Sequence, residues 1–357
     1  MSAARAEFGR RLRELRTAAG LTQARLGHLL GYHHSLISKV EAGTRTPPPD
    51  LARGCADLLG DDLTRLWWAV EAESGRSPDV VAGLAAVLAA YERFNDGFGG
   101  VPIIPALEGQ LRTVRAWLAE RGDPALPRLA AALAFRCGWA HVENGRHRQG
   151  ALWLTRAATW SRTARDRTTA GTAVTYLGVI ALVHGDLPQA ARQAARARVE
   201  APRDEAVDFL ASLLESRVHA AAGAETPCLR ALDHAAGLDR RTHGPMLLDA
   251  GRAACFRDLA ARRGDPGLAR QAVEHAKAAL RRTPVDSRPS RALFAVRLAD
   301  AYACAAEPES AVAAAATCVD APWGGDLVRR ELAGLKQRLV ARWGRVREVR
   351  RFTDLIG

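Results

Sequence analysis

The residues TQARLGHLLGYHHSLISKVEAG, at positions 22–43, predict two short helices joined by a tight turn. Gly31 supplies the positive φ that such a turn needs. Gly27 has no Cβ, so it leaves room for the two helix backbones to cross closely. Ile37 and Val40 then lie on the inner face of the second helix, where branched side chains pack against the first helix. This stretch therefore predicts a helix-turn-helix unit.

The rest of the first 75 residues predicts three more helices. Apolar residues at helical spacing over 8–19 predict one helix before the unit. Three consecutive prolines at 47–49 predict a loop after it, because proline is excluded from helix interiors. Two helices follow, one over about 50–59 and one that begins near Asp61. The polar stretch at 73–79 interrupts the helical pattern and predicts a linker.

Residues 8–60, and above all the string LTQ…LG…SLISKVEAG…P, resemble the phage-repressor-like (Cro/XRE) family of DNA-binding proteins. The resemblance implies a five-helix lambda-repressor-like domain that binds double-stranded DNA. In this family the second helix of the unit, called the recognition helix, enters the major groove, and its N-terminal residues contact base edges. One such unit contacts few base pairs, so a homodimer on a repeated half-site is expected.

The resemblance also implies positions for the residues that contact DNA. Four residues are expected on the groove side of the recognition helix: His34, Ser35, Ser38 and Lys39. Four are expected to contact phosphates: Gln23, His33, Thr44 and Arg45. Lys39 is expected to donate to guanine O6 and N7. Arg16 and Glu41 occupy the positions of an internal ion pair. His33 departs from the Ser, Thr or Asp that usually caps the recognition helix, so a less rigid start of that helix is expected.

The net charge of +12 is weak support for DNA binding by itself, because arginine supplies 48 of the 51 basic residues, a bias typical of GC-rich coding sequences. The distribution of charge is more informative. Residues 1–48 carry a formal charge of +5 and residues 49–75 carry −4. A small domain with one basic and one acidic side can orient itself on a polyanion.

From about residue 125 the sequence repeats with a period of roughly 40 residues. A small residue recurs at the corner of each predicted helical hairpin: Gly145, Gly185, Gly223, Gly264 and Ala306. This part resembles a degenerate tetratricopeptide array. The predicted fold class is therefore all-α: a DNA-binding domain over 1–76, followed by a tetratricopeptide-like α-solenoid over 77–357 that senses a signal or dimerises.

Such arrays curve, and the first helix of each hairpin lines a concave groove. The repeat offsets place twelve residues toward this groove: Phe135, Trp139, Glu143, Thr175, Val179, Leu182, Leu213, Arg217, Asp258, Arg262, Val296 and Asp300. A wall of aromatic and charged residues suits a peptide or a small molecule. The alternative is that the aromatic residues are ordinary core between helices.

No catalytic, metal or cofactor motif is found in the sequence. The six cysteines are scattered and are expected to be small buried hydrophobes. The adjacent His33 and His34 have no third metal ligand nearby in sequence. No apolar stretch is long enough to span a membrane, and Met1–Arg16 is not a secretory signal, so a cytoplasmic protein is expected.

The whole chain resembles bacterial XRE-type regulators with C-terminal tetratricopeptide repeats. That resemblance implies a sequence-specific transcriptional regulator whose repeat domain binds a peptide or small-molecule signal, dimerises, or both. The alternative is a protein-interaction adaptor that uses the repeat groove and has little or no affinity for DNA. No enzyme activity is predicted.

Overall fold

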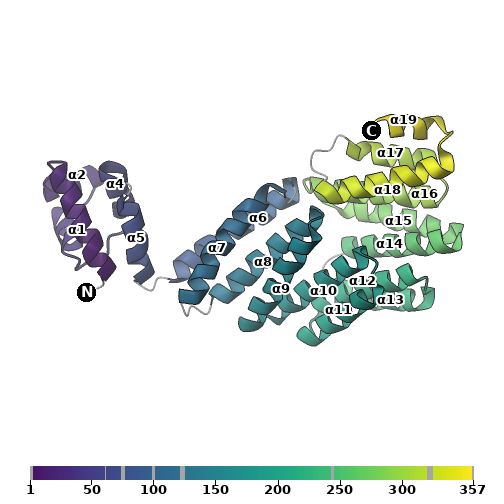
Figure 1. Ribbon diagram of the computed structural model, residues 1–357, viewed down its shortest axis with the longest axis horizontal. Coiled ribbons are helices and arrows are strands. Elements are labelled where there is room, and N and C mark those ends of the chain that lie inside the picture. Colours follow the sequence, from purple (N-terminus) through teal and green to yellow (C-terminus); the bar gives the residue numbers. More distant parts are fainter. Residues whose placement is uncertain are drawn as a thin grey trace. The chain divides into compact units, whose positions relative to one another are not determined.

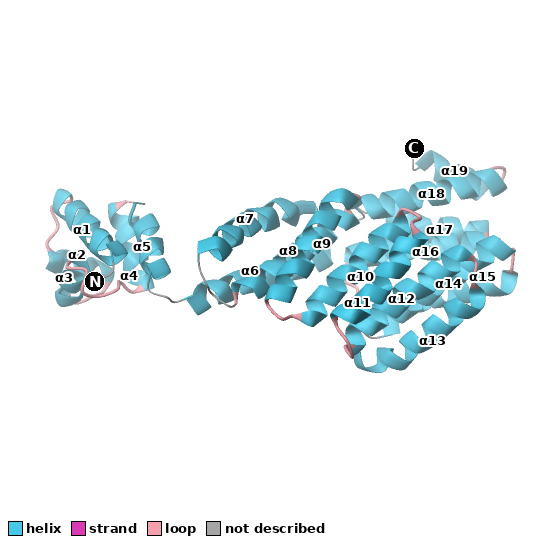
Figure 2. Ribbon diagram, turned by 60° about the horizontal axis from the view of Figure 1, so that its bottom comes forward, coloured by secondary structure: helices cyan, strands magenta, loops and turns pink. Residues whose placement is uncertain are grey.

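The computed structural model describes residues 3–60, 62–73, 77–98, 101–120, 125–242, 245–319 and 325–355. All regular structure in those ranges is helical (Figure 2). The helices are α1 (Ala3–Ala18), α2 (Gln23–Leu30), α3 (His34–Glu41), α4 (Pro49–Leu59), α5 (Asp62–Glu73), α6 (Ser77–Phe98), the 3-10 turn η1 (Val101–Ile103), α7 (Ile104–Glu120), α8 (Leu126–Glu143), α9 (His147–Thr163), α10 (Arg167–Val183), α11 (Leu187–Glu200), α12 (Glu205–Ala222), α13 (Glu225–Thr242), α14 (Pro245–Arg263), α15 (Pro266–Arg282), α16 (Arg288–Cys304), α17 (Pro308–Val319), α18 (Gly325–Trp343) and α19 (Arg347–Leu355).

The chain divides into two compact units, Met1–Gly83 and Leu84–Gly357. We call them the N-terminal unit and the repeat unit. The division falls inside α6, whereas the sequence analysis placed it between residues 76 and 77. Residues 77–79 of the expected linker are already helical, and residues 74–76 lie outside the described part of the chain.

The N-terminal unit contains the five predicted helices, α1 to α5, around one apolar core. Phe8, Leu12 and Ile37 are among its fully buried side chains. Gly31 adopts φ 73° at the end of α2, as the turn requires. At Gly27 a Cβ would lie 2.5 Å from the carbonyl oxygen of Tyr32, too close for any other residue without a backbone shift. The glycines therefore fix how closely α3 follows α2.

The repeat unit is a stack of antiparallel helical hairpins that lie side by side in chain order (Figure 1). The corner residues that the period predicted all adopt left-handed backbone conformations: Gly145 (φ 68°), Gly185 (φ 77°), Gly223 (φ 78°), Gly264 (φ 66°) and Ala306 (φ 61°). These corners join α8 to α9, α10 to α11, α12 to α13, α14 to α15, and α16 to α17. The sequence period is therefore the structural period.

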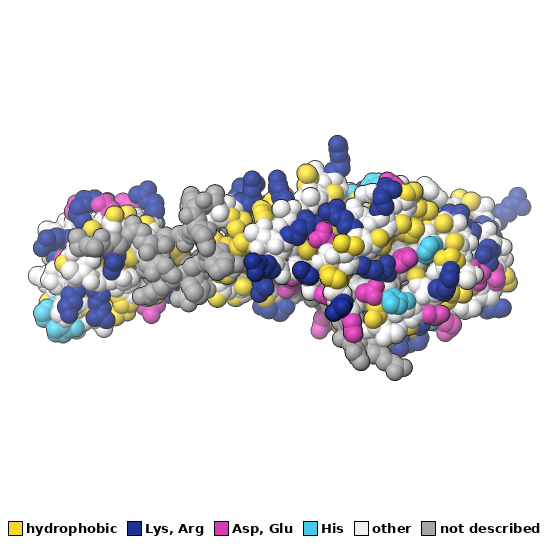
Figure 3. Space-filling view, turned by 90° about the horizontal axis from the view of Figure 1, so that it is seen from below, with side chains coloured by type: hydrophobic (Ala, Val, Ile, Leu, Met, Phe, Trp, Pro, Cys, Tyr) yellow, Lys and Arg dark blue, Asp and Glu magenta, His cyan; other side chains and the backbone are white. Residues whose placement is uncertain are grey.

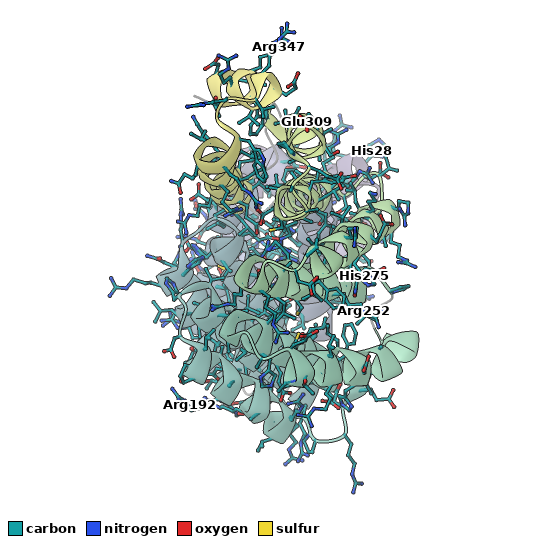
Figure 4. The ribbon with its side chains drawn as sticks, turned by 90° about the vertical axis from the view of Figure 1, so that its right-hand side faces the viewer. His28, Arg192, Arg252, His275, Glu309 and Arg347 are labelled. Atoms are coloured by element: carbon teal, nitrogen blue, oxygen red, sulfur yellow. The ribbon has the colours of Figure 1, made fainter. Side chains whose placement is uncertain are left out.

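Small residues let the helices of a hairpin approach each other. A Cβ on Gly138 of α8 would lie 3.1 Å from the carbonyl oxygen of Gly150 in α9, and a Cβ on Gly150 would lie 3.0 Å from that of Gly138. Polar pairs add links between helices: the Nδ1 atom of His275 in α15 lies 2.9 Å from Oδ1 of Asp249 in α14. By contrast, Arg192 and Arg347 point outward from the stack (Figure 4). Charge on the outside and small residues between helices are typical of a helical repeat.

The first helices of successive hairpins also contact one another, from α8 through α10, α12, α14 and α16 to α18. The row returns on itself, because α18 contacts α8. These helices therefore surround the concave side of the repeat unit. None of the helices in the described ranges combines the length and apolar character needed to cross a membrane.

Candidate nucleic-acid interface and repeat cavity

Helix α3, the expected recognition helix, presents a polar face to solvent. Ile37 and Val40 point into the core, where they are almost fully buried. His34, Ser38 and Lys39 are exposed on the other side, and Ser35 is half-buried. The helix is thus anchored by its apolar face and offers the side chains that the sequence analysis placed in the groove.

His33 caps the start of α3, although histidine is not the residue that usually does so. Its Nδ1 atom accepts a hydrogen bond from the backbone N–H of Ser35 at 3.3 Å and lies 2.9 Å from the Ser35 hydroxyl. An unprotonated ring nitrogen thus satisfies one of the N–H groups that a helix start leaves without a partner. At the other end, the Thr44 hydroxyl donates to the carbonyl oxygen of Lys39 at 3.0 Å. Both ends of the helix are held locally.

A buried polar network lies beneath α3. The guanidinium of Arg16 binds the carboxylate of Glu41, with Nε to Oε1 at 2.5 Å and Nη2 to Oε2 at 3.1 Å, as the family resemblance implied. Gln23, expected to hold a phosphate, donates its side-chain amide to Glu41 Oε2 at 2.8 Å. The amide group has two N–H donors, so one remains for a phosphate. The network links the start of α2 and the end of α3 to α1.

The basic residues of the N-terminal unit fall into two groups. On α1, Arg10 and Arg11 are paired with nearby carboxylates. Within the described part of the chain, no acidic partner is found for Arg25, Lys39 or Arg45. In the view of Figure 3, histidine and Lys/Arg side chains lie close together at one end of this unit. Positive charge without an internal partner therefore gathers around the recognition helix, where it attracts an anion.

The concave side of the repeat unit holds a cavity of about 430 Å³. Its walls come from α8, α9, α10, α14, α16 and α18 and the corner after α8. The lining residues are Val142, Gly145, His147, Val183, Arg257, Asp258, Ala261, Asp300, Cys304, Leu327, Arg330, Glu331, Gly334 and Arg338. This volume is in the range of small-molecule and cofactor sites.

Charged groups in the cavity are mostly paired with one another. Arg257 lies 2.7 Å from Asp258 and 3.1 Å from Asp300, and Arg338 also binds Asp300. Glu331 is bound by Arg297 at 3.1 Å. Burial disfavours ionisation of Glu331, but Arg297 and the other neighbouring guanidinium groups outweigh it and lower the pKa of this carboxyl.

Arg330 differs from the other charged residues of the cavity. Its Nη2 atom lies 3.5 Å from the carbonyl oxygen of Gly145, and it has no carboxylate partner among the described residues. His147 lies nearby and contacts His184, with Nδ1 to Nε2 at 3.0 Å. Burial lowers the pKa of His147, and the charges of His184 and Arg330 lower it further. Among the described residues, Arg330 is thus the one guanidinium of the cavity without a carboxylate partner.

The predicted groove residues divide into three groups. Asp258 and Asp300 line the cavity, and Arg217 reaches Asp258 at 3.7 Å. A second group is half-buried or exposed on the first helices without lining the cavity: Glu143, Val179, Leu182, Leu213 and Arg262. A third group is packed inside. Val296 is fully buried against Ala292, Cys318 and Val328, so it does not face the groove, and the buried Thr175 donates its hydroxyl to the carbonyl oxygen of Gly171.

The aromatic residues expected in the groove pack between helices, as the alternative interpretation held. Phe135 and Trp139 of α8 both meet the ring of Tyr176 in α10 edge-on, with centroids 5.3 and 4.6 Å apart. Sequence reasoning missed Arg257, Arg330 and Arg338. Continuing the repeat offsets by one more unit would have found Arg338. It follows Asp300 by 38 residues and Asp300 follows Asp258 by 42, both close to the period of roughly 40 residues.

Comparison with known proteins gives a match to a domain family and a weak likeness to solved structures. Residues 7–68 match a protein family described as a helix-turn-helix domain. No curated protein matches the chain. Among solved structures, Bacillus thuringiensis PlcR, crystallised with the peptide PapR7 and DNA, is similar at 15% identity over 76% of this chain and 95% of that chain, with a TM-score of 0.34. Residues 7–68 of the N-terminal unit are therefore a helix-turn-helix domain.

Proposed function

We propose that this protein is a sequence-specific DNA-binding transcriptional regulator. The observation that carries the proposal is the face of α3: Lys39 is exposed and has no internal acidic partner among the described residues, while Ile37 and Val40 hold the helix from behind. Lys39 donates to guanine O6 and N7 in the major groove. Arg25 and Arg45 meet the flanking phosphates, which position the helix without conferring sequence preference.

The regulator acts as a homodimer. A single helix-turn-helix unit contacts few base pairs, and two units on a repeated half-site supply the specificity that a genome demands. The repeat unit supplies the dimer contact or the signal, or both. No enzymatic role is part of this proposal.

The signal is a peptide or small molecule that carries an acidic group. The cavity has room for part of a peptide or for a small ligand, and Arg330 is available to bind a carboxylate. Ligand binding shifts the repeat unit between two arrangements and changes the geometry of the dimer. A difference of about 1.4 kcal/mol in the ligand's affinity for the two states changes DNA affinity tenfold.

The DNA half of the proposal is tested with the full chain and a pool of random duplexes. Selected duplexes are titrated by fluorescence anisotropy at several salt concentrations. We expect log affinity to fall with log salt at a slope of about −0.9 for each phosphate contacted. Lys39→Ala should cost about 1–3 kcal/mol of discrimination against the wrong base pair. Arg53→Ala, which removes an exposed arginine paired with Asp50, is the matched control and should leave the base preference unchanged. If no duplex is selected, or if Lys39→Ala leaves the preference intact, the adaptor alternative gains.

The signal half is tested by titrating acidic peptides and small acids while operator affinity is measured. A ligand that acts through the cavity should change operator affinity in the wild type and fail to do so in Arg330→Ala. Arg330→Ala without ligand should bind the operator as the wild type does. Unchanged operator affinity at saturating ligand would dismiss the regulatory role of the cavity.

A further inference from the structure

Three side chains with metal-binding chemistry, none of which lines the cavity, meet between α7 and α8. Glu108 lies on α7, and Cys137 and His141 lie on α8. One ligand atom from each, a carboxylate oxygen, the thiol sulfur and an imidazole nitrogen, all lie within 4.8 Å of one another. Cys137 and His141 are four residues apart, so they share one face of the helix. That face is turned toward Glu108.

The spacing suits a tetrahedral ion. Two nitrogen or oxygen ligands, each about 2.1 Å from a zinc ion, lie about 3.4 Å apart. The Nε2 atom of His141 and Oε1 of Glu108 are 3.1 Å apart. A thiolate, an imidazole and a carboxylate together are the donor set that zinc accepts. Three protein ligands leave the fourth position for water.

The surroundings separate this group from an ordinary surface cluster. Cys137 is fully buried and the side chain of His141 is only 3% exposed, whereas that of Glu108 is 36% exposed. Metal ions can therefore enter beside Glu108 and reach a site that is otherwise closed. The Nδ1 atom of His141 is buried and has no hydrogen-bond partner among the residues that the structure describes. The hydrogen bond to Glu108 thus accounts for only one of the two ring nitrogens.

We propose that Glu108, Cys137 and His141 form a binding site for a zinc-type divalent transition metal. The site links α7 to the first helix of the repeat array. When the metal binds, the Cys137 thiol loses its proton to solvent and the sulfur coordinates as thiolate. The site lies in the repeat unit and includes none of the residues of α3. The sequence analysis expected no metal site, because the cysteines are scattered. It could not find this group, since Glu108 is 29 residues from Cys137 and the three residues form no local motif.

The experiment uses the reduced full-length chain and Co²⁺ as a spectroscopic probe. Co²⁺ bound to a thiolate gives a sulfur-to-metal charge-transfer absorption that water and carboxylate ligands do not give. We expect this absorption to saturate at one equivalent and to be lost on addition of excess Zn²⁺. Cys137→Ser should abolish it. Glu108→Gln, a change at the half-exposed ligand that leaves the buried packing in place, should weaken binding at least about tenfold, the loss that removal of even an outer partner causes.

Two control variants address the other candidate ligands. Cys228→Ser removes a fully buried thiol elsewhere in the repeat unit, and His184→Gln removes an exposed histidine that contacts His147. Both should keep the absorption and the stoichiometry. Circular dichroism checks that each variant is folded. The proposal is overturned if Co²⁺ gives no thiolate absorption, or if the absorption survives in Cys137→Ser or is unaffected in Glu108→Gln. None of these results bears on operator binding.

Discussion

The N-terminal unit and the repeat unit place their candidate sites differently along the sequence. The predicted DNA contacts all lie between Gln23 and Arg45, on two consecutive helices and their ends. The cavity of the repeat unit is lined by residues from Val142 to Arg338, on helices that meet only because the stack curves. Local spacing is enough to define the first site, whereas the second depends on the summed rotation of every hairpin.

The charged groups also differ between the two sites. Around α3, Arg25, Lys39 and Arg45 are unpaired in the described part of the chain, and the buried Arg16–Glu41 pair only supports the helix from below. In the cavity, arginines and carboxylates bind one another across helices. Cations around α3 are thus available to a polyanion, while most cations of the cavity hold the array together.

The largest expected effect is on the buried pair of the N-terminal unit. Glu41→Gln keeps the size of the side chain but leaves the nearly buried Arg16 without a counter-charge. Removing one partner of such a pair costs about 3–5 kcal/mol. We expect the loss of folding free energy to lie at the low end of this range, because Arg16 also donates to the carbonyl oxygen of Leu21 at 2.6 Å. Hydrogen–deuterium exchange of the full chain in urea should show earlier opening of α1–α5 and unchanged protection in the repeat unit.

Glu14→Gln is the control for that prediction. Glu14 is 45% exposed and pairs with Arg10 and Arg11 on the surface of α1, so its loss should cost less than about 1 kcal/mol. Equal effects of the two variants would show that the buried network does not hold α3, and the contrast between the units would then fail.

A smaller effect is expected in the cavity. Asp300→Asn removes the charge shared by Arg257 and Arg338, which joins α14, α16 and α18. Arg257 keeps its contact with Asp258, so the expected loss is about 2 kcal/mol, as for one hydrogen bond to a charged group. Exchange should become faster in α16 and α18 alone. Asp326→Asn, at an exposed pair with Arg329, should have almost no effect. Faster exchange throughout the repeat unit would mean that the charges, rather than apolar packing, hold the stack.

The smallest effect tests the repeat period itself. Four of the five corners are glycine, but Ala306 adopts φ 61° with a side chain present. Ala306→Gly should therefore stabilise the repeat unit by about 1 kcal/mol, because a left-handed conformation is unfavourable for residues with a Cβ. Ala305→Gly, at a neighbouring position with φ −77°, should instead destabilise it by about 0.5–1 kcal/mol. Thermal unfolding of the two variants measures the difference, and shifts of the same sign would contradict the assignment of the corner.

The sequence predicted those features that depend on neighbouring residues. The five helices of the N-terminal unit, the inward faces of Ile37 and Val40, and the five corners of the repeat unit are confirmed. The hydrogen bond from Gln23 to Glu41 was not predicted, since it depends on how α2 and α3 sit against α1.

The remaining differences lie in the repeat unit and come from the same cause. Val296 is buried because residues of α17 and α18 cover it, which the offsets within one hairpin do not reveal. Arg330 enters the cavity because α18 reaches α8, almost 190 residues earlier in the chain. Neither contact follows from a repeat pattern, because small variations in the angle between hairpins accumulate along the array.

The contact between α18 and α8 closes the stack of hairpins into a ring, whereas a stack without this contact would be an open arc. In an open arc each hairpin can tilt independently of distant ones. Here, a change in pitch at any step must either be absorbed by the other steps or separate Arg330 from Gly145. A bound molecule that touches both helices would therefore resist such changes everywhere in the ring, including hairpins that it never contacts.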